Sequence, residues 1–148
     1  MSKNLTYIKG NLFSAPKGSV LIHACNTQGS WGAGVAAAFA SKFPIQRKLY
    51  ADHCALLGKL ALGTCLILRA NDYQIACLFT SEHYGAQKDA PDTILEHTHS
   101  AVRDLLSQVK DTDTLAMPKI NSGLFAVPWD ATAKVLGEFN REFLIYVP

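Results

Sequence analysis

Long apolar runs are missing from this chain of 148 residues. No stretch approaches the roughly 20 consecutive apolar residues that a membrane-spanning helix needs. No signal peptide is visible, because the N-terminus leads straight into a strand-like segment. An excess of one charge is missing too: 14 Lys and Arg residues face 12 Asp and Glu residues, for a net charge of +2. We therefore expect neither a membrane nor a sequence-specific nucleic acid as a partner.

Paired cysteine motifs are also absent. The four cysteines are Cys25, Cys54, Cys65 and Cys77, and no two of them form a C-x-x-C pair. This spacing disfavours a zinc site and a disulfide framework, so we predict no metal and no cofactor. Free, buried thiols indicate a reducing compartment, and we expect the cytoplasm, with the nucleus as a second option.

Several familiar catalytic signatures do not occur. No cysteine is followed by an arginine six positions later, which excludes a cysteine phosphatase, and there is no P-loop lysine. Gly29, Gly32 and Gly34 give the pattern G-x-x-G-x-G rather than the dinucleotide fingerprint G-x-G-x-x-G. A classical dinucleotide dehydrogenase is therefore disfavoured.

What the chain does contain is enough apolar material for one core. Hydrophobic residues make up 49% and charged residues 18% of it, so we predict a single domain over residues 1–148. Short apolar runs alternate with amphipathic segments, which indicates an α/β fold with a largely parallel or mixed sheet. The predicted strands are Leu5–Lys9, Val20–Ala24, Cys65–Leu68, Ile75–Thr80, Leu115–Met117 and Phe143–Val147. The predicted helices are Val35–Ala40, Ile45 to about Gly58, Pro91–Val109 and Trp129–Phe139.

The segment Leu21–Val35 is the most informative part of the sequence. An apolar strand runs into a histidine, an asparagine and three glycines, and a helix follows. In open α/β sheets, ligands bind at the carboxyl ends of strands, and glycines let backbone N–H groups approach an anion closely. The segment therefore predicts a phosphate or diphosphate site. The alternative is a turn whose glycines serve only its backbone conformation.

Two side chains near these glycines could contribute chemistry. His23 could transfer a proton as general acid or base, although a histidine in an apolar strand is often a core residue. Asn26 could hold a sugar hydroxyl with its donor and its acceptor, or it could cap the turn. We expect Cys25 to pack, since no Lys or Arg stands beside it in the sequence.

A second loop, Asn121–Pro128, repeats the topology of the first one. It follows a predicted buried strand and precedes a predicted helix. Two such loops could clamp one diphosphate from both sides. Leu124 and Phe125 would then cover the ligand and exclude water, or alternatively pack on the core.

Three segments together resemble the macrodomain family, and the resemblance spans nearly the whole chain. They are Gly10–Phe13, His23–Asn26 with the Gly29–Val35 loop, and Ile120–Phe125. The resemblance implies a three-layer α/β/α fold around a mixed, largely parallel sheet. Ile22–Asn26, Leu78–Ser81 and Pro118–Trp129 are more closely similar to the small macrodomain phosphatases that act on ADP-ribose 1″-phosphate.

The resemblance also implies roles for individual residues. Asn11 stands at the family's adenine-binding aspartate, the Leu12 N–H would bind the adenine ring, and Tyr146 would stack on it. Asn26 would hold the distal ribose. The backbone around the phosphates would come from Gly32, Ala33, Gly34 and Val35 on one side and from Ser122, Gly123, Leu124 and Phe125 on the other.

Two positions depart from a related glycohydrolase branch of the family. That branch has a lysine nucleophile after its fourth strand and an aspartate in the second loop, where this chain has Ser81 and Phe125. Covalent lysine chemistry is therefore disfavoured here. In addition, His23 stands where the common family motif has asparagine.

The expected activity is hydrolysis of ADP-ribose 1″-phosphate to ADP-ribose and phosphate. Loop N–H groups would neutralise the phosphoryl oxygens, and His23 would act as general base or general acid, with Asn26 fixing the sugar. Two alternatives stay open: an ADP-ribose-binding module without catalysis, and release of ADP-ribose from modified proteins or from O-acetyl-ADP-ribose. The expected partners are thus ADP-ribose derivatives, with ADP-ribosylated proteins as further candidates, and we expect a monomer.

The assignment of His23 leads to a first prediction. His23→Ala should abolish phosphate release and leave ADP-ribose binding within about tenfold of the native value, or roughly 1.4 kcal/mol. Phosphate assays and calorimetry measure the two quantities, and full phosphatase activity in the variant would remove His23 from the mechanism.

Overall fold

One six-stranded sheet organises the computed structural model, which describes residues 3–148. The strand order is β1-β6-β5-β2-β4-β3, and every neighbouring pair is parallel except β3 with β4. The mixed, largely parallel sheet that we predicted is therefore confirmed. The strands are β1 (Leu5–Lys9), β2 (Val20–Asn26), β3 (Cys65–Arg69), β4 (Gln74–Ser81), β5 (Leu115–Met117) and β6 (Phe143–Val147).

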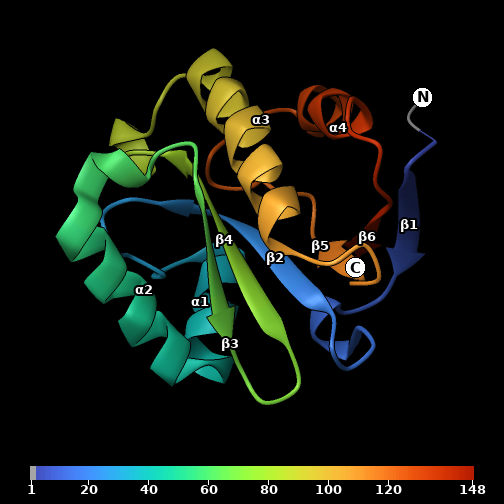
Figure 1. Cartoon of the computed structure of the whole chain (residues 1–148). Helices are drawn as coiled ribbons and strands as arrows, with labels where there is room; N and C mark the ends of the chain where they lie inside the picture. The colour runs from blue at the N-terminus through green and yellow to red at the C-terminus, as the bar shows by residue number, and fades with distance from the viewer. Residues whose placement is uncertain (1–2) are drawn as a thin grey trace.

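Two pairs of helices cover the two faces of the sheet (Figure 1), which confirms the three-layer architecture. Along β2, Leu21 and Cys25 pack toward α1 and α2, while Val20 and Ile22 pack toward α3 and α4. Because both faces of β2 are buried, its first three residues, Val20 to Ile22, are all apolar. The α-helices are α1 (Gly34–Lys42), α2 (Pro44–Leu57), α3 (Pro91–Gln108) and α4 (Trp129–Gly137).

Three short 3₁₀ helices complete the chain: η1 (Leu12–Ser14), η2 (Gly58–Ala61) and η3 (Gly85–Gln87). The sequence did not lead us to predict them, since each has only one turn. Within residues 3–148, no helix is both long and apolar enough to span a membrane.

Several predicted boundaries differ from the observed ones by one or two residues, as the ends of β2 and α4 illustrate. Strand β2 continues past Ala24 to Asn26, because it stays paired with β4 across a register shift at Cys25 and Asn26. Helix α4 ends at Gly137 rather than at Phe139. The longer β2 matters for the site, because it places Asn26 at the carboxyl end of this central strand.

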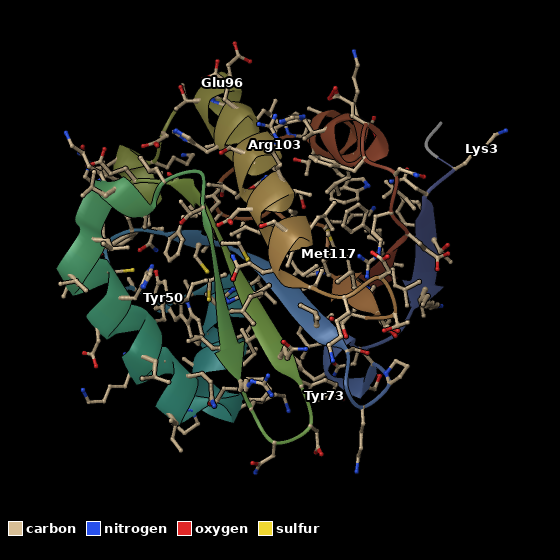
Figure 2. All side chains as sticks on the ribbon, viewed as in Figure 1. Lys3, Tyr50, Tyr73, Glu96, Arg103 and Met117 are labelled. Atoms are coloured by element: carbon tan, nitrogen blue, oxygen red, sulfur yellow. The ribbon has the colours of Figure 1, made fainter. Side chains whose placement is uncertain are left out.

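An aromatic cluster fills the space between the sheet and α1. Phe39 of α1 is fully buried, and its ring lies 4.0 Å from the His23 ring and 5.0 Å from the Phe13 ring, measured between centroids. Trp31 stacks on Tyr50 of α2 at 4.8 Å. Side chains fill the layers on both sides of the sheet in this way (Figure 2).

Phe39 supports a test of this packing. Phe39→Ala should cost about 3–5 kcal/mol of unfolding free energy, because it opens a cavity among aromatic rings. The matched control is Leu56→Ala, since Leu56 is 82% exposed and its loss should change stability by less than about 0.5 kcal/mol. Urea denaturation measures both, and equal effects would contradict the assignment.

Candidate functional site

A cavity of about 970 Å³ opens at the carboxyl ends of three neighbouring strands, β5, β2 and β4. This position is where open α/β sheets bind ligands, and the volume suits a nucleotide-sized molecule. The lining residues are 24–26, 30–36, 84–86, 88 and 118–125.

The first wall is the glycine loop after β2, and Asn26 holds it in place. Its Oδ1 accepts hydrogen bonds from the N–H groups of Gln28 at 2.9 Å and Ser30 at 3.3 Å, and its Nδ2 donates to the Ser30 carbonyl at 2.9 Å. The Tyr50 hydroxyl donates to Asn26 Oδ1 at 3.0 Å and lies 2.7 Å from the Asn26 carbonyl. Asn26 therefore organises the turn, and one amide hydrogen of its Nδ2 stays available for a ligand.

Helix α1 begins directly behind this loop. Its N-cap residue, Ala33, provides no side-chain cap, and the N–H groups of Gly34, Val35 and Ala36 find no acceptor within residues 3–148. Gly34 has a φ of 61°, a conformation that favours glycine. Unpaired N–H groups at a helix N-terminus attract an anion, and all three residues line the cavity.

The second wall is the loop after β5, and Asn121 anchors it. Asn121 has a φ of 65°, which is uncommon outside glycine, and its side chain is buried. Its Oδ1 accepts from the Thr80 hydroxyl at 3.0 Å, and its Nδ2 donates to Thr98 at 3.0 Å and to Thr132 at 3.4 Å.

The N–H groups that follow Asn121 complete this wall. Those of Gly123, Leu124 and Phe125 have no acceptor within the described part of the chain, and all three residues line the cavity. Residues of both loops whose N–H groups are unpaired within residues 3–148 thus line one cavity. Leu124 is 63% exposed, which leaves it at the rim rather than in the core.

A third wall comes from the loop after β4, which the sequence analysis missed. It contributes Tyr84, Gly85, Ala86 and Lys88 to the lining. No glycine-rich pattern marks this segment as a binding loop. Only the strand order reveals it, because β4 lies next to β2 although β3 separates them in the sequence.

The charges around the cavity have one sign. Lys88 and Lys119 line it, and within residues 3–148 no carboxylate and no imidazole does. Together with the unpaired N–H groups, this distribution favours an anionic ligand and places no conventional general base against it.

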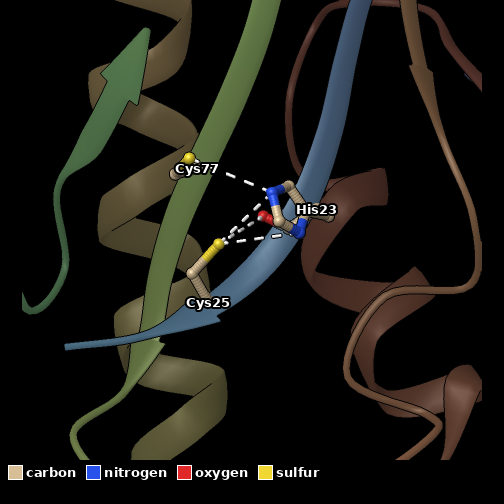
Figure 3. Close-up of side chains that lie close together, drawn as sticks. All are labelled: His23, Cys25 and Cys77. Atoms are coloured by element: carbon tan, nitrogen blue, oxygen red, sulfur yellow. Dashed lines mark hydrogen bonds between the residues drawn. The ribbon is translucent and has the colours of Figure 1, made fainter. Parts of the chain in front are cut away.

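His23 is not among the residues that line the cavity. The residue is fully buried, its ring stacks on Phe39, and Trp31 meets it edge-on at 4.9 Å. Figure 3 shows the ring beside Cys25 and Cys77. The catalytic role of His23 stays a prediction, whereas its position indicates packing. Because removing a buried ring also leaves a void among Trp31 and Phe39, His23→Leu is the control that retains much of the volume.

His23, Cys25 and Cys77 form the one group of three potential metal ligands within residues 3–148, with all ligand atoms inside 4.8 Å. The Cys25 sulfur lies 3.6 Å from Nδ1 and 3.5 Å from Nε2 of His23. All three side chains are buried. That no metal binds here stays a prediction.

The same cluster alters the acidity of Cys25. Burial raises the pKa of this thiol, but the hydrogen bond with Cys77 and the nearby His23 outweigh it and lower the pKa to about 6. Burial raises the pKa of Cys54 to about 11 and raises the pKa values of Cys65 and Cys77. Cys25 also lines the cavity, so the sequence-based expectation that it only packs was incomplete.

The residues predicted to bind adenine do not line this cavity. Asn11 caps η1 by accepting the Phe13 N–H at 2.9 Å, and Leu12 is buried in the core. Tyr146 is only 8% exposed and packs in the same core cluster, because it lies within β6 rather than at its end. Asn11 and Leu12 follow β1 and Tyr146 belongs to β6, and both strands lie beyond β5 in the sheet.

The fold and the cavity define a class of protein: an α/β domain with a cavity at its strand ends whose lining favours an anion. Comparison with known proteins identifies the family. The Macro domain model matches residues 22–136, and the chain belongs to that family.

Relatives and solved structures agree with this assignment. A Lodderomyces elongisporus protein named ADP-ribose 1″-phosphate phosphatase is 43% identical over 95% of this chain and 96% of its own. A Candida albicans protein of the same name is 40% identical over 97% and 99%. The macrodomain of Mycobacterium tuberculosis DarG superposes with a TM-score of 0.80, at 21% identity over 97% of both chains. Thermosipho africanus DarTG in complex with ADP-ribose gives 0.77, at 21% identity over 99% of this chain and 42% of that one.

The acidity of Cys25 can be tested by alkylation. Thiolates are the reactive form, so a small electrophile near neutral pH should modify Cys25 before Cys54, Cys65 and Cys77. Its rate should rise through about pH 6 and level off well below 9.0, the ordinary thiol pKa. Peptide mass spectrometry gives the order of modification. A rate for Cys25 that rises only near pH 9 would contradict the assigned acidity.

Proposed function

We propose that this protein hydrolyses the phosphomonoester of ADP-ribose 1″-phosphate, releasing ADP-ribose and inorganic phosphate. The observation that supports this proposal is the convergence of two sets of unpaired N–H groups and two lysines on one cavity without carboxylates. Relatives at 43% and 40% identity, matched over nearly their full lengths, bear the name of this activity.

Binding and charge neutralisation account for most of the proposed catalysis. In phosphoryl transfer the enzyme mainly positions the reactants and stabilises charge on the phosphoryl oxygens. The N–H groups of Gly34–Ala36 and of Gly123–Phe125 are fixed donors for those oxygens. Asn26 offers its remaining amide hydrogen to the ribose, while its other contacts keep the loop rigid.

The absence of a carboxylate or imidazole from the lining of the described chain also supports a second candidate. The same cavity could bind ADP-ribose, free or attached to a protein, without turning it over. Turnover of ADP-ribose 1″-phosphate separates the two functions. We further propose that the protein acts as a monomer in the cytoplasm or nucleus, and its four free, buried cysteines support a reducing compartment.

The proposed function can be tested by phosphorus NMR of the purified protein with ADP-ribose 1″-phosphate. We expect the phosphomonoester resonance to be replaced by that of inorganic phosphate. Calorimetry with ADP-ribose runs in parallel. Binding of ADP-ribose with no phosphate release would favour the non-catalytic module. A protein that neither binds ADP-ribose nor releases phosphate would contradict both functions.

Gly34 gives a matched pair of variants for this assay. In Gly34→Ala a side chain meets a φ of 61°, and relieving that strain should move the N–H groups at the start of α1. We expect phosphate release to fall by about tenfold, as for the loss of one charge-assisted hydrogen bond.

The control is Gly58→Ala at the end of α2. Gly58 has a similar φ of 53°, and an added Cβ there meets no atom within 4 Å. Its variant should lose comparable stability but keep its turnover. Equal losses of turnover in the two variants would show that strain, and not the cavity, controls the activity.

A further inference from the structure

We propose that Lys88 is the residue that distinguishes ADP-ribose 1″-phosphate from ADP-ribose, by pairing with the terminal phosphate. Lys119, the other lysine that lines the cavity, would then pair with the diphosphate, which both ligands contain. The inference rests on the proposed function and assigns separate tasks to the two cations of the cavity.

The strand order places the two lysines on opposite sides of the first glycine loop. Lys119 follows β5 and Lys88 follows β4, and β2 lies between these strands. The residues predicted to hold adenine, Asn11 and Tyr146, lie beside β1 and β6, beyond β5. These residues do not line the cavity, and the proposal takes from them only the direction of the ligand: with its adenosine toward β6, the ligand meets Lys119 first and brings its far end to Lys88.

Hydrogen bonds fix the loop that bears Lys88 against the first glycine loop. The Glu82 carbonyl accepts from the Thr27 hydroxyl at 3.1 Å, from the Thr27 N–H at 3.3 Å and from Gln28 Nε2 at 3.2 Å. The two loops are thus joined at their bases. The loop that bears Lys88 is therefore not an independent segment, because its first residues are bonded to the first glycine loop.

The base of the Lys88 loop is closed as well. The Asp89 N–H donates to the Ser81 hydroxyl at 3.2 Å, and Asp89 Oδ2 accepts the Glu82 N–H at 2.9 Å. Lys88 itself donates its N–H to the Gly85 carbonyl at 3.2 Å. Ser81, which stands where the glycohydrolase branch has its lysine, therefore acts as the attachment point of this loop.

The ammonium group of Lys88 has no partner that competes with a ligand. Within residues 3–148 the ion pairs are Lys48 with Asp52 and His83 with Glu82, and neither lysine of the cavity takes part. The neighbouring Asp89 carboxylate accepts a backbone N–H instead. A half-buried lysine without a carboxylate partner, in a cavity without carboxylates, is suited to a phosphate.

The chemical difference between the two ligands explains the selectivity. ADP-ribose 1″-phosphate has an additional phosphate with up to two negative charges, where ADP-ribose has a neutral hydroxyl. A charge that meets only this phosphate contributes to one ligand and not to the other. A cation near the diphosphate contributes to both equally.

Lysine-to-methionine variants test this division, because methionine keeps much of the apolar stem and removes the charge. Steady-state phosphate release gives kcat/KM for ADP-ribose 1″-phosphate, and calorimetry gives the Kd for ADP-ribose. For Lys88→Met we expect kcat/KM to fall by about tenfold or more, with a Kd changed by less than about twofold. For Lys119→Met we expect both quantities to worsen by similar factors.

Two further variants serve as controls. Lys88→Arg keeps the charge and should recover most of the lost kcat/KM. Lys17→Met removes an exposed lysine that precedes β2, at the amino end of the strand and away from the cavity. This variant should change neither quantity.

Either of two results would overturn the inference and leave the proposed function standing. One is a Lys88→Met variant with unchanged kcat/KM, and the other is a variant that loses ADP-ribose affinity as strongly as it loses turnover. A native protein that binds ADP-ribose but releases no phosphate would instead overturn the proposed function, and the inference with it.

Discussion

The hydrogen bonds of the Tyr50 hydroxyl with Asn26 attach the first glycine loop to helix α2, and the rest of the site depends on this attachment. A glycine-rich loop loses much conformational entropy when it is ordered. Burial raises the pKa of the Tyr50 hydroxyl, which therefore stays protonated and able to donate. Because Asn26 in turn fixes Gln28 and Ser30, the later N–H groups of the loop are held in place before any ligand arrives.

The hydrogen-bond donors that line this cavity come mainly from the backbone. The side chains that hold the two loops in place are Asn26 and Asn121. They form most of their hydrogen bonds with other residues of the chain. Main-chain N–H groups and two lysines are what remains for the ligand. Such a site is specified by loop conformation, and side-chain identity matters where it sets a left-handed φ or supplies a charge.

The sequence predicted the features that have local causes. Periodicity gave the strands and helices, and glycines between a strand and a helix gave both N–H loops. The third wall was missed because Lys88 reaches the cavity only through the adjacency of β4 and β2. The burial of His23 depends on α1, whose Phe39 covers the ring, and no local pattern contains that contact. Tyr146 failed to reach the cavity for a similar reason, since its strand packs it into the core.

The side chain of Asn121 joins the second loop to three other elements, because its partners Thr80, Thr98 and Thr132 belong to β4, α3 and α4. Its backbone conformation is costly for an asparagine and persists only while those bonds hold it. A fluctuation that detaches α4 would therefore also release the second loop. Ligand occupancy and local opening are then thermodynamically linked, and amide hydrogen exchange in α4 should slow when the cavity is filled, although α4 contributes no residue to its lining.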